Sequence, residues 1–333
     1  MMPITAYKGT YHGEEAIWLK AESYEAVMLP TRGGNLIAFR DIKRDFHFLR
    51  EPTLEQMETV FTNRPFVFGI PVLFPPNRFD GGQFTWRGQQ YNFPINEIAY
   101  DNHLHGFLYD AKWNVNAFGA DHTESYVSVS IEINEEHPIY RYFPHCFTIR
   151  IRYSLSSLGL AQHVMIRNDG LTDMPCMIAF HTTLNAPFAI DSSVDDYQFH
   201  VTIGDRWQLN GRMLPTEKFQ SLTADEKRLQ NEFISPFFEP MDNHYTAAPR
   251  NGSNRMELVD GHHRIKLIYD VGTAYREWMI WNNDAQAGFF CPEPQTSVIN
   301  APNLALAKEQ TGIIALGPNQ IWEETSRLYA IQL

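Results

Sequence analysis

The chain has 333 residues, of which 44% are hydrophobic and 14% aromatic, and its formal net charge at pH 7 is −12. This balance is typical of a globular protein and excludes a disordered or fibrous one. The richest apolar run, 66–76, is interrupted by a glycine and three prolines, and no run reaches the ~18 apolar residues of a membrane-spanning helix.

The net charge indicates which partners the protein can bind, and the cysteines indicate the cellular compartment. An acidic chain is a poor binder of nucleic acid, because that binding depends on clustered Lys and Arg. The N-terminal residues show no charged segment followed by an apolar one, so we expect no signal peptide. The three cysteines, Cys146, Cys176 and Cys291, are far apart and form no CxxC pair. We therefore expect a cytoplasmic protein without disulfides, a monomer or homodimer with no membrane partner.

Most patterned segments alternate apolar and polar residues, as half-buried strands do. In chain order, alternation and turn residues predict strands at 16–21, 24–30, 35–41, 127–133, 147–155, 160–168, 174–182, 197–203, 265–269, 277–282 and 311–317, with a hairpin at 83–93. Helical spacing predicts only two short helices, 53–61 and 223–232, the second capped by Thr223. Many short strands separated by Pro, Gly, Asn and Asp favour an antiparallel sandwich or barrel, which we expect to form one domain over 1–333.

Five segments place a titratable or hydrogen-bonding side chain beside residues that restrict the backbone. They are Asn77-Arg78 before Gly81-Gly82, Asn102 to Gly106, His181 to Asn185, Asp242-Asn243, and Glu293-Pro294-Gln295. No glycine-rich phosphate loop and no GxSxG nucleophile motif accompanies them.

Each segment also has a purely structural interpretation. Arg78 could stabilise a turn, and Asp242 could be a solvated residue of a polar loop. His103 and His105 would share one side of a strand, as metal ligands can, but no carboxylate follows at a suitable spacing. His181 ends an apolar run and could be a core histidine. Glu293 is the least easily explained, because burying a carboxylate on a stiff apolar segment is costly without a partner or a role.

Taken in order, the five segments resemble the aldose 1-epimerase (galactose mutarotase) family, in a divergent branch. The resemblance spans roughly residues 30 to 333. It departs from the family at Phe180-His181-Thr182-Thr183-Leu184-Asn185, where the family commonly has Thr-His-Pro-Tyr-Phe-Asn. It implies a large antiparallel β-sandwich, which agrees with the predicted strands.

The resemblance also implies an activity, the interconversion of α and β anomers of a free hexose. Carried over, Glu293 is the general base and His181 the general acid, on opposite sides of the anomeric centre. The sugar would be bound by Arg78, Asn77, His105 and Asp242. No metal or other cofactor is required. We expect nearby carboxylates to raise the pKa of His181 and keep it charged.

Two other functions remain open. A hexose-6-phosphate 1-epimerase of the same superfamily would need a cluster of basic residues, and only Arg78 is tied to a motif, so a neutral sugar is expected. A non-catalytic sugar-binding or sensor protein would lack the acid or the base, and both His181 and Glu293 are present.

Overall fold

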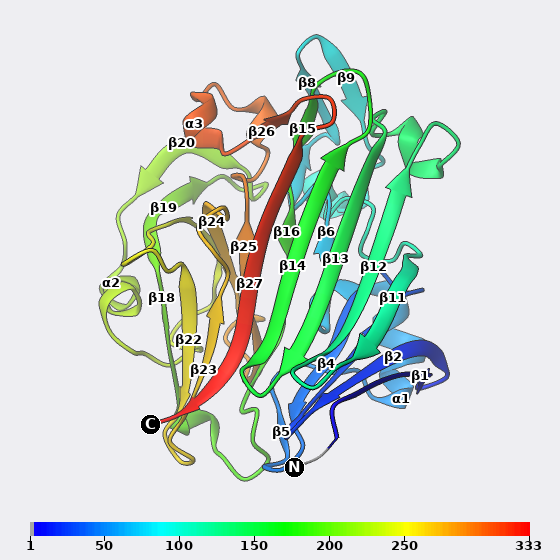
Figure 1. The fold of residues 1–333 in the computed structure, drawn as a ribbon. Coiled ribbons are helices and arrows are strands. Elements are labelled where there is room, and N and C mark those ends of the chain that lie inside the picture. Colours follow the sequence, from blue (N-terminus) through cyan, green and yellow to red (C-terminus); the bar gives the residue numbers. More distant parts are fainter. Residues whose placement is uncertain (1–2) are drawn as a thin grey trace.

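The computed structural model describes residues 3–333 and consists of antiparallel strands arranged in two layers (Figure 1). One layer is an eight-stranded sheet, here called sheet I. Its strands in order are β11 (Asn114–Ala120), β12 (Ser125–Ile133), β13 (Phe147–Ser156), β14 (Gly159–Asn168), β27 (Ile321–Gln332), β23 (Ile265–Asp270), β22 (Arg255–Asp260) and β18 (Tyr197–Val201). The large antiparallel β-sandwich expected from the sequence is confirmed.

Two sheets form the other layer. Sheet II has the order β20 (Pro215–Gln220), β19 (Ile203–Leu209), β21 (Asp242–Ala247), β24 (Glu277–Trp281), β25 (Gly288–Gln295), β16 (Ala179–Phe180) and β6 (Val72–Leu73), with β17 (Leu184–Ala186) also paired to β25. Sheet III has the order β1 (Thr5–Tyr11), β2 (Glu14–Ala21), β3 (Tyr24–Leu29), β4 (Asn35–Asp41) and β5 (Phe46–His47). A single apolar cluster takes side chains from all three sheets, for example Phe39, Ile149 and Trp278.

Short elements complete the chain. Three two-stranded sheets pair β7 (Arg78–Asp80) with β10 (Asn102–Leu104), β8 (Gln83–Trp86) with β9 (Gln89–Asn92), and β15 (Met174–Cys176) with β26 (Ile314–Leu316). The helices are α1 (Leu54–Gln56), which continues as a π-helix (Met57–Phe61), α2 (Ala224–Asn231), α3 (Lys308–Thr311), and 3₁₀ turns at Pro65–Val67, Ile98–Tyr100, Pro138–Arg141, Val194–Asp196 and Ala301–Asn303. None of the helices within residues 3–333 has the length and apolar character needed to cross a membrane.

The local patterns were interpreted correctly where one face of a strand is buried. In β13 the side chains of Phe147, Ile149 and Ile151 lie in the core, whereas Arg150 is exposed. Thr223 caps α2 as expected, because its hydroxyl accepts from the N–H of Glu226 and the Glu226 carboxylate accepts from the N–H of Thr223.

Three predicted strands are wrong in extent. Segment 174–182 is two strands, because β15 pairs with β26 whereas β16 joins sheet II. Segment 197–203 also divides, since β18 ends in sheet I and β19 begins in sheet II. Segment 311–317 begins with the end of α3, and Gly312 follows in the left-handed region with φ 71°.

Alternation along sheet II decides which side chains are available for chemistry. Tyr245, Trp278 and Phe290 point into the sandwich core. Because neighbouring residues on a strand point to opposite faces, the intervening side chains of β21, β24 and β25 project from the other face. The site described below lies on that outer face.

Candidate active site

Three adjacent strands of sheet II bring motif residues from distant parts of the chain together. The register pairs Met279 with Glu293, and Asp242 with Trp281. These four side chains line a pocket of about 240 Å³, which His105 and His181 also line. Asp242 was interpreted as a possible loop residue; it is instead the first residue of β21, and 35% of its side chain is exposed.

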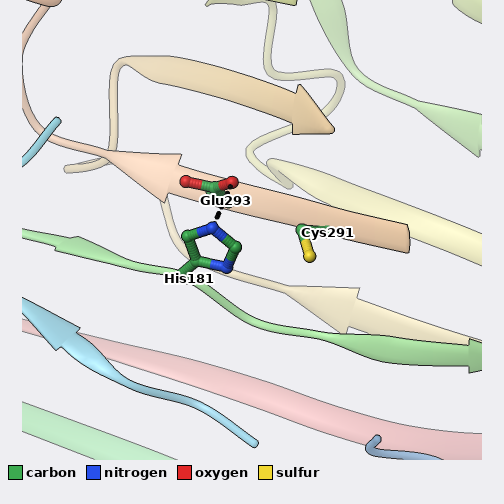
Figure 2. Close-up of side chains that lie close together, drawn as sticks. All are labelled: His181, Cys291 and Glu293. Carbon is green, nitrogen blue, oxygen red and sulfur yellow. Dashed lines mark ion pairs between the residues drawn. The ribbon is translucent and has the colours of Figure 1, made fainter. Parts of the chain in front are cut away.

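His181 and Glu293 form a close pair at the base of the pocket (Figure 2). Nε2 of His181 lies 3.3 Å from Oε1 of Glu293, and the two side chains are only 5% and 2% exposed. His181 stands in the short link between β16 and β17, where its N–H donates to the carbonyl of Pro71. Nδ1 of His181 and Oε2 of Glu293 are buried and have no hydrogen-bond partner among residues 3–333. A buried polar atom without a partner is costly, so these atoms are suited to a polar ligand.

The protonation of this pair differs from the sequence-based expectation. Burial lowers the pKa of His181 to about 3, in place of the increase expected from nearby carboxylates. Burial, with a smaller contribution from Asp242, raises the pKa of Glu293 well above its usual range. Removal from water penalises both charged forms, and here it outweighs their mutual attraction. Burial therefore favours the uncharged form of each group, the imidazole of His181 and the carboxyl group of Glu293.

A pair of left-handed residues shapes the wall beside His181. Asn77 and His105 have φ of 57° and 69°, and the N–H of His105 donates to the carbonyl of Asn77. The His105 ring lies 5.2 Å from that of His181 and perpendicular to it. Gly106 makes the turn possible, since a Cβ at this position would lie 2.3 Å from the carbonyl oxygen of Phe74. Within the described part of the chain, Oδ1 of Asn77 and Nδ1 of His105 are buried and have no hydrogen-bond partner.

His103 and His105 do not face the same way. β10 ends at Leu104, so the alternation breaks before His105. The His103 ring packs between Phe93 and Phe107, and its Nδ1 is 2.7 Å from the carbonyl of Pro94. His103 therefore packs among aromatic rings outside the pocket lining, whereas His105 lines the pocket.

Arg78 is held by two carboxylates. Its Nε lies 3.0 Å from each carboxylate oxygen of Glu97, and its Nη2 lies 3.5 Å from Oδ2 of Asp242. Asn102 fixes Glu97 in turn, donating from Nδ2 to Oε2 at 3.1 Å. The charge of Arg78 is thus balanced within the protein, and its side chain lines the pocket.

Donor atoms of two clusters lie close enough to hold a cation. The first comprises His181, Cys291 and Glu293 (Figure 2), and the second comprises Asp191, His262 and His263 at the surface. In the first cluster, burial raises the pKa of the Cys291 thiol well above its usual range, and Oγ1 of Thr183 lies 3.3 Å from the sulfur. Metal binding there would require loss of the thiol and carboxyl protons.

Among the pocket residues that sequence reasoning missed are these four: Arg64, Phe66, Glu97 and Trp281. Phe66 packs on both His105 and His181, with ring centroids 4.8 and 5.7 Å apart. Trp281 lies 5.9 Å from His181 on another side. A partial signal existed for Trp281, which lies within the predicted strand 277–282, but none of the four is part of a recognisable motif.

Comparisons with known proteins agree with this architecture. Residues 15–329 match the sequence profile of the family described as aldose 1-epimerase. A crystal structure of a galactose mutarotase-like protein from Clostridium acetobutylicum superimposes with a TM-score of 0.94, at 30% sequence identity over 99% of each chain. A galactose 1-epimerase from Lactobacillus acidophilus NCFM shares the fold, with a TM-score of 0.75 and 15% identity over 98% of each chain.

A curated sequence relative matches over a shorter stretch. The uncharacterized protein YihR of Escherichia coli is 26% identical over 147 residues, so the match spans 44% of this chain and 44% of YihR. The family profile, in contrast, covers nearly the whole chain, and the structural match at 30% identity extends over both molecules. The resemblance noted in the sequence is confirmed: this chain is a divergent member of the aldose 1-epimerase family.

Proposed function

We propose that this protein interconverts the α and β anomers of a pyranose aldose, with Glu293 and His181 as the acid–base pair. The observation that supports the proposal is the 3.3 Å separation of Nε2 of His181 and Oε1 of Glu293 at the base of a pocket lined with unpartnered polar atoms.

Two neighbouring catalytic groups suit a hemiacetal better than two groups on opposite sides of the anomeric centre. The two groups are neighbours, not on opposite sides of a sugar-sized space. In a pyranose the C1 hydroxyl and the ring oxygen are bonded to the same carbon, so neighbouring groups can each reach one of them. Proton transfer by such positioned groups typically contributes 10²–10⁴-fold to a rate.

The reaction needs one proton in and one proton out. Glu293 as carboxylate takes the proton of the C1 hydroxyl while His181 as imidazolium gives a proton to the ring oxygen, and the bond between C1 and the ring oxygen breaks. The open-chain aldehyde rotates about its C1–C2 bond. The C5 hydroxyl then attacks the other face of C1, His181 recovers its proton, and Glu293 returns a proton to the C1 oxygen.

The protonation of the resting pair is compatible with this scheme. Burial favours neutral His181 with protonated Glu293, and this form carries the same number of protons as imidazolium with carboxylate. One proton transfer between the two groups therefore produces the reactive form. Sugar hydroxyls that donate to Glu293 and accept from His181 would stabilise the charged form. Such coupled groups titrate as a pair, with macroscopic pKa values that belong to both.

The remaining motif residues surround this pair. Arg78 and Asp242 offer a donor and an acceptor at the mouth, and His105 and Asn77 offer their unpartnered atoms in the wall. Fixed hydrogen bonds of this kind orient a sugar and hold its anomeric carbon against the catalytic groups.

Polarimetry and exchange NMR on freshly dissolved α-sugars test the proposal. We expect Glu293→Gln and His181→Asn each to lower kcat by roughly 10²–10⁴-fold. Sheet I provides matched controls in His163 and Glu323, a surface pair 3.5 Å apart whose side chains are 45% and 63% exposed. His163→Asn and Glu323→Gln should keep wild-type rates. If Glu293→Gln keeps more than about a third of kcat, the assignment is wrong.

The sensor interpretation makes the opposite prediction. A protein that only binds sugar would show calorimetric binding without any acceleration of mutarotation, and Glu293→Gln would change affinity but no rate. That result would replace the proposed function.

A further inference from the structure

One basic residue of the pocket has no carboxylate partner. Arg64 lies at the mouth, and no ion pair joins it to a carboxylate among residues 3–333. Its guanidinium carbon lies 5.7 Å from the centroid of Phe66 and 5.9 Å from that of Trp281, the two rings that flank His181. Arg78 differs, because Glu97 and Asp242 balance its charge.

Arg50 is a second guanidinium without an ion pair to a carboxylate in residues 3–333. Arg50 is held by aromatic faces, with its guanidinium carbon 3.8 Å from the centroid of Phe289 and 4.4 Å from that of Phe68. Its Nη1 donates to the carbonyl of Val67, and no ion pair to a carboxylate is present in the described part of the chain. Burial lowers the pKa of Arg50, and the charge of Arg64 lowers it further. The positive charge of Arg50 adds to that of Arg64, and an anion bound at Arg64 would interact favourably with both.

The chemistry of a pyranose indicates which substituent would reach Arg64. If His181 protonates the ring oxygen, the carbon on the far side of that oxygen from C1 is C5. The exocyclic group at C6 is attached to C5, so it extends from the His181 side of the ring. Phe66, Trp281 and Arg64 surround that side.

We infer that the substrate is an aldose with an anionic group at its exocyclic C6 position, and that Arg64, supported by Arg50, binds this group. The inference rests on the proposed function for the orientation of the sugar. It revises the expectation of a neutral sugar, which depended on Arg78 being the only basic residue near the motifs. Guanidinium groups bind phosphate and carboxylate with charge-assisted hydrogen bonds, so a hexose 6-phosphate and a hexuronate share the required chemistry.

The test compares glucose and galactose with their 6-phosphates and with glucuronate and galacturonate. Exchange NMR gives kcat/KM for anomer interconversion, and calorimetry gives affinity. We expect an anionic member of either series to exceed its neutral parent by about tenfold or more in kcat/KM. The better of phosphate and carboxylate then identifies the substituent.

Variants identify the residue responsible. Arg64→Gln should reduce the ratio of anionic to neutral kcat/KM by about 10–100-fold, and Arg50→Gln should reduce it less. The matched control is Arg150→Gln, an exposed arginine on the outer face of β13, which should leave the ratio unchanged.

The outcomes separate this inference from the proposed function. If neutral sugars react as well as the anionic ones, or if Arg64→Gln leaves the ratio unchanged, the inference is overturned and the acid–base proposal stands. If no sugar is interconverted, the proposed function fails and calorimetry decides the inference. Binding of an anionic sugar that Arg64→Gln abolishes would support it, and equal or absent binding would overturn it.

Discussion

Replacing His181 by asparagine should make the free energy of unfolding less dependent on pH under acidic conditions. Burial lowers the pKa of His181 from 6.5 to about 3 in the folded protein, whereas an unfolded chain restores the ordinary value. Between these values the unfolded state binds more protons, so the free energy of unfolding rises with pH and is lost as pH falls. The limiting slope is about 1.4 kcal/mol per pH unit for one group.

The magnitude follows from this window. On acidification from about pH 6.5 to about pH 5, the His181 contribution to the free energy of unfolding should fall by about 1.5 kcal/mol. The contribution of Glu293 to the free energy of unfolding depends on pH in the opposite direction. Its folded-state pKa is raised, so this contribution is lost as pH rises. Both proteins retain Glu293, so the difference between wild type and His181→Asn reports the histidine together with its coupling to Glu293.

Urea unfolding monitored by circular dichroism at several pH values measures this difference. On acidification from about pH 6.5 to about pH 5, the free energy of unfolding of the wild type should fall by about 1.5 kcal/mol more than that of His181→Asn. For the surface control His163→Asn, the free energy of unfolding should change with pH as it does in the wild type. If the wild-type and His181→Asn curves are parallel within about 0.5 kcal/mol, His181 can be protonated in the folded protein. The argument that burial keeps it neutral would then be refuted.

Three further predictions concern the surroundings of the pair. Arg78→Met and Glu97→Gln should each cost about 2–4 kcal/mol in urea unfolding, because their side chains are only 10% and 14% exposed. The double variant should lose clearly less than the sum, and additive losses would contradict the coupling. Gly106→Ala should lower both Tm and kcat/KM, because its Cβ would contact the Phe74 carbonyl. Gly88→Ala, with φ 83° and open space around it, should cost only about 1–2 kcal/mol and keep activity. Exhaustive EDTA treatment should leave activity intact; loss restored by Zn²⁺ would assign the cluster at Cys291 to a metal.

The sequence by itself determined the sandwich and the order of its motifs. A strand with one buried face must alternate, so the pattern of Phe147, Ile149 and Ile151 was sufficient to place β13. The cap at Thr223 was also readable, because a capping box is made by residues three positions apart. The motif resemblance singled out His181 and Glu293, which the structure brings to 3.3 Å.

Only the tertiary structure decided the surroundings of that pair. Arg64, Glu97 and Trp281 lie far apart in the sequence, and no local pattern says that they meet at one pocket. The breaks in 174–182 and 197–203 depend on which sheet each half joins, and this is a choice between distant partners. The protonation of His181 was predicted in the wrong direction because the sequence shows nearby charges but not the removal of water. In the folded chain that desolvation dominates, and it depends on every element that covers the ring.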